Sequence, residues 1–94
     1  MAQQPSSMAA YSVRIKRSAT RDLAQIARQD RERIVYAIDR LGEQPHAGYP
    51  LKGALRGLRR VRVGDYRVVY EVLDDELVVL VVRVAHRREA YRRR

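Results

Sequence analysis

Apolar residues follow first an alternating and then a helical pattern along the first half of the chain. Residues 11–16 alternate between apolar and polar side chains, which predicts a half-buried strand. Over residues 19–27 the apolar side chains recur every three or four positions, so we expect a helix with Ser18 as its N-cap. A second helix is expected to begin at Asp30, its N-cap, and to end before Gly42. The two helices would form a helical hairpin.

The second half of the chain reads as a long loop followed by three strands. Glycine and proline interrupt residues 44–57, and loops of this length are often functional. We expect a two-residue turn at Gly64-Asp65 and a three-residue turn at 74–76. The three predicted strands are 58–63, 66–73 and 77–85. The order β-α-α-β-β-β predicts an α+β domain, with the helical hairpin on one face of a small, mainly antiparallel sheet.

The 94 residues are enough for one domain, which we place at 11–94, after a polar extension at 1–10 that we expect to be flexible. The longest apolar run, 77–82, is far shorter than a membrane span, and the N-terminus shows no secretory signal. We therefore expect a cytoplasmic protein. The chain has no cysteine and two histidines, so we expect no disulfide, no metal site and no cofactor.

Net charge is the most informative feature of the composition. Twenty basic residues against eleven acidic ones give a charge of +9, and all but two of the basic residues are arginine. Arginine binds phosphate in a bidentate manner and stacks on bases, so this bias favours a nucleic-acid partner. An arginine-rich genome is an alternative explanation for the ratio of arginine to lysine, but it does not explain the net excess of positive charge.

Alternation assigns the side chains of the three C-terminal strands to two faces of the sheet. In the run 66–73 one face is wholly apolar or aromatic and should meet the helices, whereas Arg67 belongs to the opposite face. Arg60 and Arg62 fall on that face too, and the two-residue turn sets Arg62 directly opposite Arg67. A three-residue turn before the last strand would also set Arg83 opposite Arg67.

Five arginines are therefore expected to converge at one end of this face: Arg60, Arg62, Arg67, Arg83 and Arg87. Like charges opposite each other on neighbouring strands are destabilising, within a range of about 0.2–1 kcal/mol per pair. A fold selected for stability alone would avoid them, so the cluster favours an anion site, and a polyphosphate backbone fits it. The alternative is a solvated basic face whose arginines point separately into water.

A cluster of arginines suits the cleavage of RNA without a metal ion. In that reaction the 2′-hydroxyl attacks the adjacent phosphorus and the 5′-oxygen leaves, which requires charge stabilisation, a proton acceptor and a proton donor. Arginines supply the charge stabilisation, and His86 and Tyr91 are the other candidates for proton transfer. Each of the two can instead have a purely structural role, because Tyr91 can pack at the periphery and His86 falls on the core side of its strand.

Three segments carry a resemblance to a known family: Leu51-Lys52-Gly53, the run 58–72 with the motif GDYRVVYEV, and HRREAY at 86–91. Together with the order of elements over residues 11–91, they resemble the RelE branch of the RelE/ParE toxin superfamily. The resemblance implies the toxin of a bacterial type II toxin–antitoxin pair. RelE-like toxins enter the ribosomal A site and cut mRNA there without metal, leaving a 2′,3′-cyclic phosphate.

The resemblance also implies roles for individual residues. Arg60 and Arg62 match two basic positions of the family, Arg67 matches its phosphate-stabilising arginine, and Arg87 and Tyr91 match its C-terminal arginine and tyrosine. The expected catalytic set is Arg62, Arg67, Arg87 and Tyr91, and the expected RNA-binding set is Lys52, Arg60, Arg83 and His86.

One position departs from the family pattern. The place of Arg62 often carries a lysine that has been proposed as the general base, whereas arginine stays protonated in proteins. Either Arg62 only stabilises charge, while His86 or water accepts the proton, or turnover is slow.

The partners that the resemblance implies are the ribosome with its mRNA and a cognate antitoxin. We expect an acidic or amphipathic segment of the antitoxin to cover the basic face, or to displace the C-terminal tail, in a heteromeric complex. Two other functions are compatible with the same fold: a ParE-like inhibitor of DNA gyrase without nuclease activity, and a non-catalytic RNA-binding module. The HRREAY ending favours the RelE branch.

Overall fold

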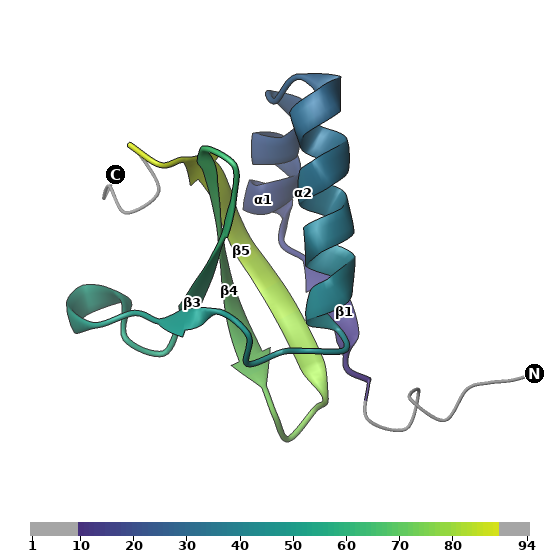
Figure 1. The fold of residues 1–94 in the computed structure, drawn as a ribbon. Helices are drawn as coiled ribbons and strands as arrows, with labels where there is room; N and C mark the ends of the chain where they lie inside the picture. Colours follow the sequence, from purple (N-terminus) through teal and green to yellow (C-terminus); the bar gives the residue numbers. More distant parts are fainter. Residues whose placement is uncertain (1–9, 89–94) are drawn as a thin grey trace, which may run out of the picture.

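The computed structural model describes residues 10–88, which form two helices packed on a five-stranded sheet (Figure 1). The elements are β1 (Ser12–Ile15), α1 (Arg17–Ala24), α2 (Arg28–Leu41), β2 (Tyr49–Pro50), β3 (Arg59–Val63), β4 (Tyr66–Leu73) and β5 (Val78–His86). The strand order is β1-β5-β4-β3-β2, with β1 parallel to β5 and the other neighbours antiparallel. The predicted α+β class and the mainly antiparallel sheet are confirmed.

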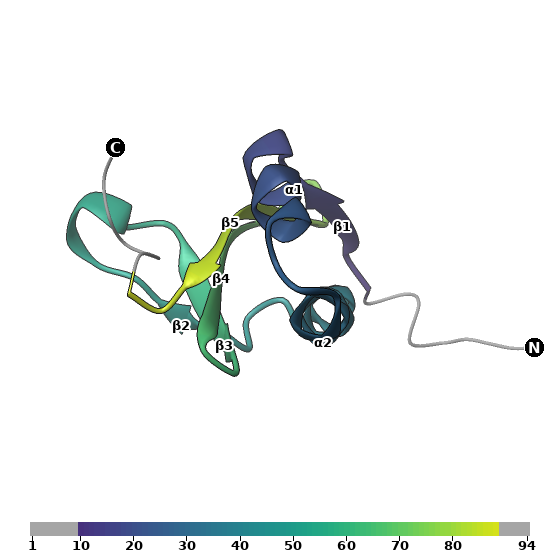
Figure 2. The same cartoon turned by 90° about the horizontal axis from the view of Figure 1, so that it is seen from above.

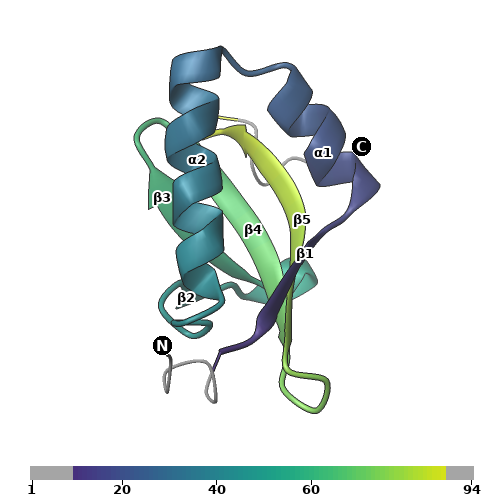
Figure 3. The same ribbon diagram turned by 90° about the vertical axis from the view of Figure 1, so that its right-hand side faces the viewer.

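The sheet has one face covered by helices and one that the helices leave free. Seen from above, it separates α1 and α2 from the short 3₁₀ helix η2 (Gly53–Leu55) (Figure 2). Figure 3 shows α2 crossing in front of β3 and β4, with α1 beside the upper part of β5. We call the side away from α1 and α2 the open face. Neither helix in the described part of the chain has the length and apolar character to cross a membrane.

The core lies between the helices and the covered face of the sheet, as the periodicity predicts. Both helices bury the residues at helical spacing, with Ile34 and Ile38 fully enclosed. Alternate residues of the central strands meet them. The sheet residues in the core are Val68, Tyr70, Val79, Val81 and Val84. Burial of the valine and isoleucine side chains of this core, each contributing about 1.5–3 kcal/mol, is the main stabilisation of the fold.

Both predicted helix caps are wrong. Helix α1 begins at Arg17 with Lys16 as its N-cap, because the chain turns into the helix directly after β1. Ser18 lies inside the first turn, and its hydroxyl donates a hydrogen bond of 2.8 Å to the carbonyl of Val82 instead. Helix α2 begins at Arg28, so Asp30 lies in its first turn, where a negative charge is favourable beside the helix N-terminus.

The predicted long loop at 44–57 contains two short elements. Tyr49 and Pro50 form β2, which pairs with Arg60 and Arg59 at the edge of the sheet, and η2 follows. Two residues are too few to show alternation, so the fifth strand is absent from the prediction. Because β2 reaches only as far as Arg60, residues 61–63 of β3 form a free edge of the sheet.

The predicted register is correct between β3 and β4 and wrong between β4 and β5. Gly64, with φ of +60°, supplies the positive φ that a two-residue hairpin turn requires, and Arg62 pairs with Arg67. The next turn has four residues rather than three, since Leu73 pairs with Val78.

A bulge then shifts the register of β4 and β5 once more, between Val69 and Tyr70. The longer turn and the bulge each move the pairing by one residue, so Arg83 keeps its predicted face but lies opposite Val69. Ala85, rather than Arg83, lies opposite Arg67.

Candidate functional site

Two arginines from neighbouring strands face each other on the open face. Arg62 of β3 and Arg67 of β4 are direct cross-strand partners, and in such pairs the Cβ atoms lie about 4.5–5.5 Å apart. Arg62 is exposed and Arg67 is half-buried. The pair concentrates two permanent positive charges at the hairpin end of the sheet, as the alternation predicts.

A third arginine is held at the same end by the backbone. The backbone N–H of Arg87 donates a hydrogen bond of 2.7 Å to the carbonyl of Asp65, which continues the pairing beyond the end of β5. Arg87 is exposed and lies beside the Gly64-Asp65 turn. Arg62, Arg67 and Arg87 therefore gather around one hairpin. We call these three residues the arginine cluster.

The arginine cluster has no acidic partner among residues 10–88. The four ion pairs of this part of the chain join Arg28 to Glu32, Arg33 to Asp30, His46 to Asp74 and Arg83 to Asp22. The exposed pairs contribute little to stability, as is usual at a protein surface. Within residues 10–88 no ion pair occupies the donors of the cluster, and the fork-shaped guanidinium group is well suited to bind an external anion.

Arg83 does not join the arginine cluster. Its Nε donates a hydrogen bond of 2.9 Å to Oδ2 of Asp22 on α1, and the same carboxylate oxygen accepts the N–H of Val84 at 2.9 Å. Helix α1 reaches this part of β5 because β1 ends at the pair Ile15–Val81 and leaves the strand edge beyond it uncovered. The expected convergence of five arginines is therefore wrong for Arg83, which ties α1 to the sheet.

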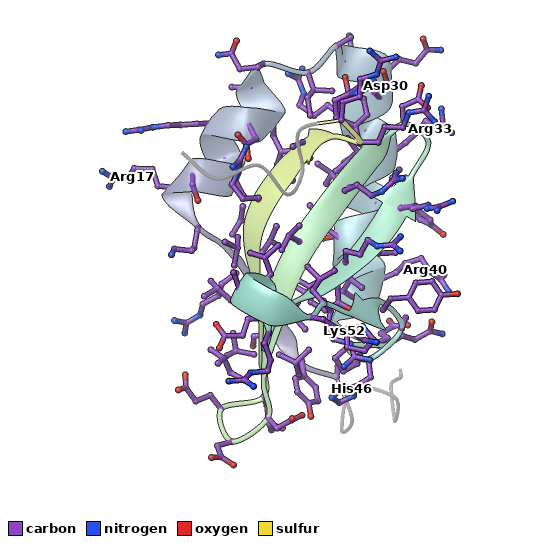
Figure 4. All side chains as sticks on the ribbon, turned by 90° about the vertical axis from the view of Figure 1, so that its left-hand side faces the viewer. Arg17, Asp30, Arg33, Arg40, His46 and Lys52 are labelled. Carbon is purple, nitrogen blue, oxygen red and sulfur yellow. The ribbon has the colours of Figure 1, made fainter. Side chains whose placement is uncertain are left out.

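Two further predicted site residues, His86 and Lys52, lie in two different places. His86 pairs with Tyr66 on the covered side, where the two rings meet edge to face with centroids 5.7 Å apart. Lys52 is exposed and precedes η2, and Figure 4 shows it at the end of the sheet where η2 lies. Tyr91 lies outside the described residues.

Arg60 lies two residues before Arg62 on β3 and faces an aromatic side chain that the sequence prediction missed. Tyr49 of β2 is the cross-strand partner of Arg60, and the Arg60 guanidinium lies 5.3 Å from the centre of the Tyr49 ring. The pair borders a cavity of about 450 Å³ on the free edge of β3. Its lining residues are Ala47, Gly48, Tyr49, Arg60, Val61 and Arg62.

The segment that carries Tyr49 is held in place by hydrogen bonds, and those made by Tyr70 are buried. The Tyr70 hydroxyl donates to the carbonyl of Pro45 at 2.8 Å and accepts the N–H of Gly48 at 2.9 Å. The Arg59 side chain donates to the carbonyls of His46 and Gly48, both at 3.1 Å. The one sequence feature that could have indicated the role of Tyr49 is an aromatic residue placed between a glycine and a proline.

The described residues offer little for metal binding. No three histidine, aspartate or glutamate side chains within 10–88 gather in a group that could hold a metal ion. At the hairpin end of the open face, the charged groups that the structure brings together are guanidinium groups, which donate hydrogen bonds and balance negative charge.

Comparison with known proteins gives a consistent result. Residues 13–91 match the family model described as the ParE toxin of the type II toxin–antitoxin system parDE. Two proteins of Mycobacterium tuberculosis are similar: toxin RelG, 35% identical over 88% of this chain and 98% of its own, and toxin RelE, 37% identical over 87% of each. The toxin–antitoxin complex RelBE2 of the same organism contains a chain 33% identical, with a TM-score of 0.77 over 82% of this chain and 98% of that one.

Proposed function

The chain belongs to the RelE/ParE superfamily, as a RelE-like toxin of a type II toxin–antitoxin system, and we propose that it cleaves mRNA in the ribosomal A site. The observation that carries this proposal is the arginine cluster, in which Arg62 and Arg67 face each other and Arg87 lies beside them without an acidic partner in residues 10–88. The place of action is the ribosome, in the cytoplasm.

The proposed reaction is an internal transesterification of RNA. The 2′-oxygen forms a bond to the adjacent phosphorus while the bond from phosphorus to the 5′-oxygen breaks, which gives a 2′,3′-cyclic phosphate and a 5′-hydroxyl. The pentacoordinate intermediate carries more negative charge than the ground state. Guanidinium groups fixed around it stabilise that extra charge, and such groups typically contribute a factor of about 10²–10³ each.

Proton transfer needs groups other than the arginines, which stay protonated. His86 faces Tyr66 on the covered side, which argues against it as the base for a phosphate on the open face. We propose that water accepts the proton of the 2′-hydroxyl and that Tyr91 donates a proton to the leaving 5′-oxygen. Arg62 then acts by stabilising charge, which is the role open to a side chain that stays protonated.

The test is mRNA cleavage by the purified protein, with programmed ribosomes and without them. Wild type is expected to cut only the ribosome-bound mRNA, and Arg87→Ala should abolish the cut. Arg17→Ala, which removes the same charge from the exposed start of α1, is the matched control and should keep wild-type activity. Unchanged cleavage by Arg87→Ala would remove Arg87 from the mechanism, and binding to the ribosome without cleavage would indicate a non-catalytic RNA-binding module.

Inhibition of DNA gyrase is the second candidate function, because the matching family model is that of the ParE toxin. A gyrase supercoiling assay distinguishes the two functions. Cleaved DNA trapped by gyrase in the presence of this protein, with intact mRNA on programmed ribosomes, would overturn the nuclease proposal.

A cognate antitoxin is the second proposed partner, since the similar chain from M. tuberculosis was solved in a toxin–antitoxin complex. We propose that an acidic or amphipathic segment of the antitoxin covers Arg60, Arg62 and Arg67. Reversing these three charges should prevent formation of the heteromeric complex in size-exclusion chromatography. A complex that forms as well with the reversed charges would contradict direct masking of the open face.

A further inference from the structure

We propose that Tyr49 and Arg60 form a stacking site for one base of the RNA, next to the arginine cluster. This inference rests on the proposed cleavage of RNA, and it adds a subsite that binds the nucleotide beside the scissile phosphate. Single-stranded nucleic acid is commonly bound by exposed aromatic rings inside a positively charged groove, because every base has a face that stacks. Tyr49 has this setting.

The Tyr49 ring is available for stacking. Tyr49 is 67% exposed, although aromatic side chains usually bury most of their surface. The Arg60 guanidinium lies 5.3 Å from the ring centre, so it orients the ring from one side and leaves exposed surface for a base. A base that stacks on Tyr49 has its phosphate within reach of the same arginine.

The position of Tyr49 is fixed in advance. Gly48 packs so closely that an added Cβ would lie 2.5 Å from the carbonyl oxygen of Arg60 and 2.7 Å from the Tyr70 hydroxyl. Together with the hydrogen bonds that Tyr70 and Arg59 make to this segment, the close contact holds β2 against β3. A fixed platform loses little entropy when a base binds, which is the advantage of preorganisation.

The distance to the arginine cluster suits neighbouring nucleotides of one strand. Arg60 and Arg62 are two residues apart on the same face of β3, so their Cα atoms are separated by about 7 Å. The cavity of about 450 Å³ extends along the edge from Tyr49 to Arg62, and this volume lies in the range of small-molecule sites. A phosphate held by Arg62 and Arg67 thus places the next base beside Tyr49.

Tyr36 provides a matched control on the same protein. It is 65% exposed, and the Arg40 guanidinium lies 6.0 Å from its ring centre, so it repeats the Tyr49–Arg60 arrangement on α2. It differs in lying on α2, where it lines a separate cavity with Arg62 and Val63 on the side of β3 that faces the helix, rather than on the β2 side. A general effect of removing an exposed tyrosine beside an arginine would appear equally in the two variants.

The experiment measures single-turnover cleavage on programmed ribosomes with two mRNAs, which differ only by an abasic nucleotide next to the cut. Loss of one stacked base corresponds to a factor of about 5–150. We expect Tyr49→Ala to slow cleavage of the normal mRNA by this factor, Tyr49→Phe to retain most activity, and Tyr36→Ala to match wild type. On the abasic mRNA, wild type and Tyr49→Ala should be equally slow.

Two results would overturn the stacking site. One is a Tyr49→Ala rate equal to wild type on the normal mRNA, and the other is the same fractional loss on both mRNAs. Thermal unfolding of each variant shows whether its fold is retained. If wild type cuts no mRNA on ribosomes, the proposed function fails by itself. The stacking site is then tested by the affinity of the free protein for a short single-stranded RNA. This affinity should be lower for Tyr49→Ala than for wild type. The same RNA with an abasic nucleotide should bind wild type and Tyr49→Ala equally.

Discussion

The covered face and the open face of the sheet are made by alternate residues of the same strands, yet their side chains differ in kind. On β3 and β4 the covered face presents Val61 and Val68, which pack towards α1 and α2, whereas the open face presents Arg62 and Arg67, each one residue nearer the Gly64-Asp65 turn. The first set gains stability from burial. The second set places like charges together, which lowers stability. Substitutions on the two faces should therefore separate stability from activity.

The largest effect is expected from the open face, on activity. Arg67→Gln keeps the aliphatic stem but removes the charge, so cleavage on the ribosome should fall by a factor of about 10²–10³. Its free energy of unfolding should not decrease, which a urea titration measures. A variant that lost both activity and stability would show that the two faces are not separable at this position.

Substitutions on the covered face should lower stability and leave the activity of the folded protein unchanged. Ile38→Ala removes a fully buried side chain, and the expected loss in free energy of unfolding is about 2–5 kcal/mol. Val35→Ala, at a more exposed position of the same helix, is the control and should lose much less. Circular dichroism measures the folded fraction of Ile38→Ala. When the cleavage rate is divided by this fraction, it should equal the wild-type rate.

Asp22 tests the link between α1 and the edge of β5. Asp22→Ala leaves the half-buried Arg83 side chain and the N–H of Val84 without their acceptor, so the free energy of unfolding should fall by about 1–3 kcal/mol. Asp39→Ala, an exposed acidic residue of α2, removes the same charge and should change stability little. Equal losses in the two variants would indicate a general charge effect.

Arg62→Gln sharpens the comparison, because stability and activity should change in opposite directions. Removing one of two facing charges is expected to raise the free energy of unfolding by about 0.2–1 kcal/mol while cleavage falls. Arg56→Gln near η2, which removes an exposed arginine outside the paired strands, should show no gain. A loss of stability in Arg62→Gln would show that the cluster is not under electrostatic strain.

The smallest effect concerns the tie between Tyr11 and the turn before β5. The hydrogen bond from the Tyr11 hydroxyl to Asp74, then burial and the negative charge of Asp74, raises the pKa of Tyr11 above its ordinary value of 10.0. The folded state therefore holds the phenolic proton more tightly, and this stabilisation is fully present below pH 10.0 and is lost as the pH rises through the raised pKa. Tyr11→Phe should be less stable than wild type at neutral pH, and the difference measured by urea unfolding should shrink in alkaline solution.

The sequence alone was sufficient to predict the features of the fold and the site that depend on local periodicity. Alternation placed Arg62 and Arg67 on one face, and the glycine at position 64 fixed their register, because a two-residue turn leaves no freedom in the pairing. The helical spacing of Ile34 and Ile38 identified the residues that cover the sheet. These predictions needed no knowledge of distant contacts.

The features that were predicted wrongly or missed depend on contacts between segments that are distant in the sequence. Leu77 adopts a positive φ that usually favours glycine, so the sequence did not show the four-residue turn that shifts Arg83. The bulge and the acceptor on α1 then determine where the Arg83 side chain goes. Likewise, Tyr49 gains its setting from the hydroxyl of Tyr70, more than twenty positions away, and two-residue β2 has no periodicity of its own.

The short β2 strand has a consequence for handling the protein. Because it stops at Arg60, residues 61–63 of β3 present an uncapped strand border, and such borders invite pairing between copies and aggregation. Arg62 is the middle residue of this border, and its positive charge repels a second copy of the same strand. Inactive versions made for expression should thus carry glutamate rather than an uncharged residue at this position, since a charge of either sign protects solubility.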